Sequence, residues 1–163
     1  MNIKDLVWSG NELFPDRKVF DFRPVMINDE YHLALITPED AEWRPFPDGL
    51  AMVLNASYQP VFSLGTEELG HRIDMHEFNI LDDGKTALIG MKIFRDPTEA
   101  EKAEVVWKGT PWTGKIMDCS FTEMNLETQE RTFNWTASEH LRISETSNPP
   151  PDRGAKETFW DWL

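Results

Sequence analysis

The sequence predicts an all-β protein built from antiparallel four-stranded meanders. Short runs of β-branched and aromatic residues alternate with turn signals along most of the chain, and the order of these runs occurs twice. Hydrophobic residues make up 40% of the 163 positions, so the composition is that of a folding sequence, and the length suits one domain with a substantial core.

The first half of the chain contains two predicted hairpins. The turn Asn28-Asp29-Glu30 separates the first pair of strands, and Asn55-Ala56-Ser57 separates the second pair. Residues 38–49 hold three prolines and several charges, which predicts a loop between the hairpins. The strands that we expect in this half occupy residues 19–27, 31–37, 50–54 and 58–64.

The stretch 75–90 predicts a third hairpin, around which the rest of the chain is organised. Asp83-Gly84 lies between two apolar runs, and glycine tolerates the positive φ that a tight turn needs. The second arm is expected to continue to residue 94. His76 opens the first arm, where it either points into a site or simply packs.

The remainder predicts one helical segment and a last hairpin. Thr98 and Glu101 have the spacing of a capping box, so residues 96–103 suit a short helix. Strands are expected at 115–121, 123–126 and 131–135. The segment 136–163 is expected to be an irregular tail, because it contains three consecutive prolines.

The repeat predicts two copies of one supersecondary unit. Phe20-x-Phe22 matches His76-x-Phe78, and the run 52–58 matches the run 117–121. The two halves, 18–64 and 75–135, are each spaced like one blade of a β-propeller. The same strands would also form a small β-sandwich, and the pattern leaves both architectures open.

Composition excludes several classes of function. The chain has 16 basic and 29 acidic residues, a formal charge of −13, which argues against nucleic acid or an anionic membrane surface as partner. No apolar run approaches the roughly 18 residues that a transmembrane helix needs. The first residues lack the apolar core of a secretory signal. A single cysteine, Cys119, excludes an internal disulfide and a multi-cysteine metal site.

Several motifs, found in one collinear order, resemble the fungal branch of the arylsulfotransferase-like family. They span about residues 5–162, and together they are much more specific than any one alone. The resemblance implies a β-propeller of about six blades, of which this chain would be an N-proximal part. The matching segments are 19–33, 51–58, 75–88, 117–128, 133–135, 139–141, 144–145 and 160–162.

Two positions depart from the pattern of the family. Phe20 stands where relatives are expected to carry a histidine, and the chain ends at Leu163 where relatives continue into a histidine-containing segment. We therefore expect a truncated member. Relatives are typically secreted or membrane-anchored, whereas no signal is present here, so the compartment stays open.

The resemblance also implies a reaction. A sulfuryl group passes from a phenolic sulfate ester to a phenol through a covalent intermediate on histidine, without a nucleotide cofactor. His76 is the best match to such a histidine, and Arg23 is a candidate inner-strand cation for the sulfuryl oxygens. A strand-end histidine with a structural hydrogen bond and an ion-paired arginine are the alternatives for these two residues.

The remaining candidates point to structure. His32, His71 and His140 lack the short spacing of metal ligands, so no metal site is expected. Asp82-Asp83 and Asp29-Glu30 are first of all turn carboxylates. A set of tryptophans is expected to form inter-blade core, namely Trp107, Trp112, Trp135 and Trp160.

Two functions of different classes follow from the sequence. One is an arylsulfotransferase-like enzyme acting on small phenolic ligands, incomplete in this chain. The other is a non-catalytic β-propeller-type binding or scaffold module. In either case two blades would leave open faces, which predicts self-association.

Overall fold

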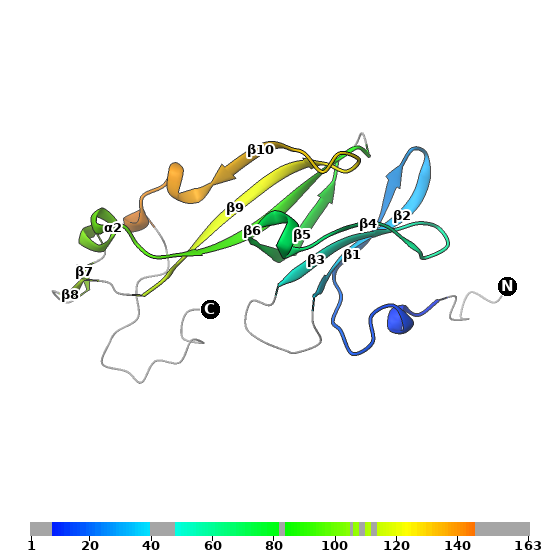
Figure 1. Cartoon of the computed structure of the whole chain (residues 1–163), viewed down its shortest axis with the longest axis horizontal. Helices are drawn as coiled ribbons and strands as arrows, with labels where there is room; N and C mark the ends of the chain where they lie inside the picture. The colour runs from blue at the N-terminus through cyan, green and yellow to red at the C-terminus, as the bar shows by residue number, and fades with distance from the viewer. Residues whose placement is uncertain are drawn as a thin grey trace. The chain divides into compact units, whose positions relative to one another are not determined.

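The protein is all-β, as the sequence predicts. The computed structural model describes residues 8–39, 48–81, 84–104, 106–107, 110–111 and 114–145. Two four-stranded sheets contain most of these residues (Figure 1). Among the described residues the longest helix has 6 residues.

The first sheet is a meander whose spatial order follows the chain, β1-β2-β3-β4. Its pairs are antiparallel, and its bounds agree closely with the hairpins expected over 18–64. The turn between β1 and β2 has Asn28 at φ 51° and Asp29 at φ 62°, the left-handed pair that suits a two-residue hairpin. The strands are β1 (Phe20–Ile27), β2 (Glu30–Pro38), β3 (Gly49–Leu54) and β4 (Pro60–Leu64).

The second sheet has the order β10-β9-β6-β5 and is also a meander along the chain. Gly84 has φ 64°, the positive value expected at the turn between β5 and β6. The two strands expected at 115–121 and 123–126 are one continuous strand, β9. The strands are β5 (Arg72–Ile80), β6 (Thr86–Arg95), β9 (Ile116–Asn125) and β10 (Arg131–Thr136).

Short elements connect and follow the sheets. The short helix α1 (Thr66–Leu69) precedes β5, while α2 (Glu99–Glu104) and the two-residue strands β7 (Val106–Trp107) and β8 (Thr110–Pro111) lie in the chain between β6 and β9. The described part of the expected tail contains 3-10 turns, and its residues 146–163 lie outside the described chain. The 3-10 turns of the chain are η1 (Gly10–Glu12), η2 (Ala137–Glu139) and η3 (Ile143–Glu145).

The chain forms two compact units. The first comprises Met1–Lys92 with Ser120–Asn134, and the second comprises Ile93–Cys119 with Trp135–Leu163. The first sheet and β5 lie wholly in the first unit, whereas β6, β9 and β10 continue from one unit into the other.

The core of the first unit explains the apolar runs of β2 and β3. Ala34 and Ile36 belong to a cluster that includes Phe78 and Ile89 of the second sheet. The intervening residue of β2, Leu35, belongs to a separate cluster with Phe14, Met52 and Leu54. Because successive side chains of a strand point to opposite faces, β2 is buried on both faces, and its sequence reads as a continuous apolar run rather than an alternating one.

Candidate functional site around His76

His76 lies in a large bulge of β5. Ile73 pairs with Met91 of β6, and the next pair is Phe78 with Ile89, so the four residues 74–77 stand opposite the single residue Gly90. A bulge of this kind bends the strand and re-aims its side chains. Gly90 accommodates it, because a Cβ atom at this position would lie 3.3 Å from the Cβ of Asp74.

The carboxylate of Asp74 closes the bulge. Its Oδ1 accepts hydrogen bonds from the backbone N–H of His76 at 2.9 Å and from Nδ1 of the same residue at 2.5 Å. Its Oδ2 pairs with Nζ of Lys92 at 3.1 Å. One carboxylate therefore fixes the backbone of the bulge, the histidine ring and a cation of the neighbouring strand.

The surroundings of Asp74 keep it ionised. Partial burial raises its pKa, but hydrogen bonds from the ring and backbone of His76 and the charge of Lys92 outweigh that effect, so the pKa lies below its usual value of 3.8. Lys92 contributes although it is itself largely buried, with 9% of its surface exposed. Near neutral pH Asp74 is therefore a carboxylate beside the basic side chain of Lys92.

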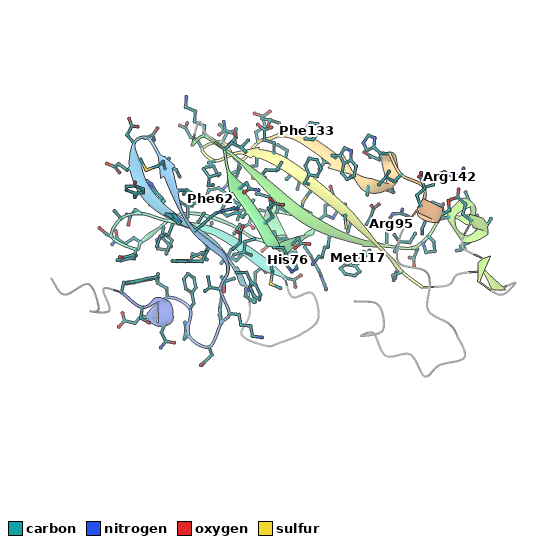
Figure 2. All side chains as sticks on the ribbon, turned by 180° about the vertical axis from the view of Figure 1, so that it is seen from behind. Phe62, His76, Arg95, Met117, Phe133 and Arg142 are labelled. Carbon is teal, nitrogen blue, oxygen red and sulfur yellow. The ribbon has the colours of Figure 1, made fainter. Side chains whose placement is uncertain are left out.

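The imidazole of His76 projects from β5 into solvent (Figure 2). Its side chain is 79% exposed, and Nδ1 faces the carboxylate of Asp74. With Nδ1 as the hydrogen-bond donor, the neutral ring carries its free electron pair on Nε2. In this tautomer Nε2 faces solvent and can act as a nucleophile or general base, while Nδ1–H is hydrogen-bonded to the carboxylate of Asp74.

Arg23, the other candidate of the sequence analysis, is engaged elsewhere. Its Nη2 lies 2.8 Å from Oδ2 of Asp21 and also donates to the backbone carbonyl of Phe78. Among the described contacts, none joins the guanidinium to the ring of His76. The structure thus places the two candidates on adjoining sheets of the first unit, with Arg23 in an ion pair.

The other candidates have local roles or lie outside the described residues. Nδ1 of His32 is 3.1 Å from the backbone oxygen of Glu30, and the ring of His140 stacks on Trp135 with centroids 5.1 Å apart. Within the described part of the chain, no group of three or more His, Cys, Asp or Glu residues is arranged to hold a metal ion. Not described are Asp82, Asp83, Trp112, Trp160 and the side chain of Trp107.

A second cluster of charges belongs to the second unit. Arg95 pairs with Glu101 at 2.5 Å and with Asp118 at 3.2 Å. The expected capping box is confirmed, because the N–H of Thr98 donates to Glu101 at 2.8 Å and the N–H of Glu101 donates to Oγ1 of Thr98 at 3.2 Å. The hydrogen bond from Arg95 is the main cause that lowers the pKa of Glu101 to about 2. These contacts attach α2 to β6 and β9, so we interpret the cluster as structural.

Sequence reasoning missed Asp74, Lys92 and Gly90. Asp74 lies just before the predicted third hairpin at 75–90, and Lys92 lies in the expected extension of its second arm, so neither is a candidate from the sequence pattern. The signal that would have found Asp74 is the spacing Asp74-Met75-His76, because an aspartate hydrogen-bonds readily to the backbone two residues ahead.

Comparison of the chain with protein families, with curated proteins and with solved structures finds no match. In the described residues, no helix has both the length and the apolar character that crossing a membrane requires.

Proposed function

We propose that this chain is an arylsulfotransferase-like protein that moves a sulfuryl group from a phenolic sulfate ester to a phenol through His76. The motifs that resemble the family support the reaction class. The single geometric observation that supports His76 is its bulge, in which the 2.5 Å contact between Nδ1 and Asp74 orients an otherwise exposed ring.

The first step forms a bond between nitrogen and sulfur. The electron pair on Nε2 of neutral His76 attacks the sulfur, the bond from sulfur to the aryl oxygen breaks, and the phenolate leaves and takes a proton from water. The sulfonated ring becomes positively charged at that moment. Asp74 stabilises this charge through the Nδ1–H hydrogen bond, as a carboxylate does for an imidazolium.

The second step reverses the first with a different phenol. The oxygen of the acceptor attacks the sulfur, the bond to Nε2 breaks, and its electron pair returns to the ring while the phenolic proton passes to solvent. No electrons are exchanged with an oxidant or reductant, and no nucleotide is needed. Lys92 supports both steps indirectly, because its charge helps to keep Asp74 ionised.

The test is an assay of sulfuryl transfer from 4-nitrophenyl sulfate to phenol. The rate is measured from the absorbance of the 4-nitrophenolate that is released. His76→Ala should lower the rate by at least about 100-fold, the usual scale for loss of a group that acts on the reacting bonds. His32→Ala is the matched control, since His32 is also a strand histidine but bonds only to a backbone oxygen. Intact-mass measurement of a quenched reaction should show one sulfuryl group on wild type and none on His76→Ala. Equal turnover of the wild type and His76→Ala would refute the assignment.

The exposed apolar residues of β1 and β2 favour a second function, a non-catalytic binding module. Phe22 is 51% exposed, Met26 46% and Tyr31 70%, and Met26 pairs with Tyr31 across the two strands. Apolar groups that gather at a surface mark sites of association. A folded wild-type chain without turnover, which self-associates in sedimentation velocity and loses that association on Tyr31→Ser with Met26→Ser, would establish this function instead.

A further inference from the structure

The outer edge of β5 has backbone groups that need partners. β5 is the last strand of its sheet, so along one side its N–H and C=O groups have no neighbouring strand of that sheet. Such an edge is an open template for pairing unless other groups cover it. At Phe78, the first paired residue after the bulge at 74–77, the cover comes from the other sheet.

A bulge in β1 supplies the cover. Phe20 pairs with Ile36, and the next pair is Arg23 with Ala34, so residues 21–22 stand opposite the single residue Leu35. Asp21 has φ 47°, a left-handed conformation that Asp and Asn adopt more easily than most residues. The bulge turns this carboxylate toward β5.

Two charged side chains then bind both backbone groups of Phe78. Oδ2 of Asp21 accepts the N–H at 2.6 Å, and Nη2 of Arg23 donates to the C=O. The same two atoms of Asp21 and Arg23 lie 2.8 Å apart. We call this ion pair the clip, because it binds the backbone of Phe78 in place of a neighbouring strand. Hydrogen bonds to charged groups are the stronger kind.

We propose that Asp21 and Arg23 are positioning residues for His76, and this inference rests on the proposed function of that histidine. Ile73 and Phe78 anchor the two ends of the bulge, and both side chains are buried, at 2% and 0% exposed. His76 lies two residues from the clipped peptide. Its ring is exposed, and within the described residues only the side chain of Asp74 hydrogen-bonds to it, so the backbone of the bulge determines where the ring lies.

The assignment gives Arg23 a different role from a cation on the sulfuryl oxygens. Its Nη2 is occupied by Asp21 and by the carbonyl of Phe78. The guanidinium acts on the histidine through the backbone of β5.

The experiment separates the clip from general stability with three variants and a control. Asp21→Ala removes the acceptor, whereas Asp21→Asn keeps an oxygen for the N–H of Phe78 and tolerates the left-handed backbone. Arg23→Met removes the donor to the carbonyl and retains an unbranched apolar chain. The control is Asp96→Ala, which breaks an exposed pair with Lys115 in the second unit at 2.7 Å.

Two nuclear magnetic resonance readouts decide the outcome. The first is hydrogen exchange of the Phe78 amide, which should rise about tenfold in Asp21→Ala, the scale expected when one hydrogen bond is lost. The second is the pair of ring ¹⁵N shifts of His76 in alkaline solution, where the neutral tautomer is visible. We expect Asp21→Ala and Arg23→Met to move these shifts from the Nδ1–H form toward a mixture, and Asp21→Asn and Asp96→Ala to leave them as in wild type.

A faster Phe78 amide beside unchanged ring shifts in Asp21→Ala and Arg23→Met would overturn the proposal, because the clip would then be structural only. If Asp21→Ala does not fold, unchanged ring shifts of His76 in a folded Arg23→Met would by themselves overturn the proposal, because that variant removes the hydrogen bond to the carbonyl of Phe78. Failure of the proposed function is distinguishable, since it would appear as absent sulfuryl transfer in the wild type while the ring shifts still answer the question about the clip.

Discussion

The ion pair between Asp74 and Lys92 should make a measurable contribution to stability that depends on both partners. Asp74 accepts three hydrogen bonds, one of them from the buried Lys92. The side chain of Lys92 is 10% exposed and that of Asp74 is 26% exposed, so solvent screens this pair less than it screens a surface pair. The perturbation is Asp74→Asn, which keeps the shape of the side chain and an oxygen for the N–H of His76.

The expected magnitude follows from what each substitution leaves behind. Asp74→Asn removes the carboxylate beside a buried ammonium, and we expect a loss of about 3 kcal/mol in the free energy of unfolding. Lys92→Met leaves a carboxylate that is more exposed and still bonded by His76, so its loss should be smaller, about 1–2 kcal/mol. The double variant should lose less than the sum, with a coupling energy of about 1–2 kcal/mol.

The assay is a double-mutant cycle in which urea unfolding of each variant is monitored by far-ultraviolet circular dichroism. The cycle is measured at neutral pH and again in acid. The folded-state pKa of Asp74 lies below its unfolded value of 3.8, so its contribution is complete above that pH and is lost as the pH falls through the lowered pKa. The coupling should therefore disappear on acidification. A coupling below about 0.5 kcal/mol at neutral pH, the usual error of additivity, would contradict the reasoning. So would a coupling that persists after the carboxylate is protonated.

Three further predictions concern the core and the second unit. Phe78→Ala should cost about 3–5 kcal/mol, because the ring is 0% exposed and stacks near Phe62 with centroids 6.3 Å apart; chemical unfolding measures this, and a cost below about 1 kcal/mol would contradict the assigned core. Glu101→Gln should loosen α2 by about 1–2 kcal/mol, seen as faster exchange of the Lys102 amide, because the substitution removes the charge that Arg95 binds. In the wild type the same protection should persist well below pH 4.5 and be lost as the pH approaches about 2, since the folded-state pKa of Glu101 is lowered to that value; loss near 4.5 would contradict the ion pair.

The sequence could predict those parts of the fold that local chemistry determines. Asn28 and Asp29 tolerate the left-handed backbone of a tight hairpin, and both adopt it. Gly84 has the positive φ expected of it, and Thr98 with Glu101 forms the expected capping box. Each of these features depends on residues within a few positions of one another.

Elements that depend on distant partners could not be predicted in the same way. Thr122 falls between the two strands that were expected in place of β9, and a polar residue there suggests a break. In the structure its Oγ1 donates to the backbone oxygen of Phe133 at 2.8 Å, so the polar group is satisfied and the strand continues. Likewise β5 begins at Arg72, before the predicted hairpin at 75–90, and the partner of Asp74 in this first part of the strand is Lys92, eighteen residues further along the chain.

The repeat was visible in the sequence, but the structure aligns its hairpins differently. Asn55 follows the third strand of the first sheet, and Asn125 ends the third strand of the second. Each side-chain Oδ1 accepts two backbone N–H groups of the following loop. In each loop the residue before the last has positive φ, Tyr58 at 60° and Gln129 at 56°. Aligned on these asparagines, Met52 corresponds to Thr122 and not to Met117.

The same comparison relates the two first strands and bears on the site. Both β1 and β5 contain a bulge with an aspartate, and in both the carboxylate bonds to the basic side chain two residues ahead, Arg23 for Asp21 and His76 for Asp74. The bulge of β1 inserts one extra residue and that of β5 inserts three, as the pairs on either side require. The short bulge of β1 places its ion pair against the backbone of Phe78, and the hydrogen bonds of that ion pair join the two sheets. The long bulge leaves its basic residue exposed on the strand that the first bulge secures. The motif Asp-x-basic thus joins the sheets in β1 and presents a histidine in β5. Because the basic residue follows the aspartate by two positions in both strands, His76 corresponds to Arg23 and not to Phe20.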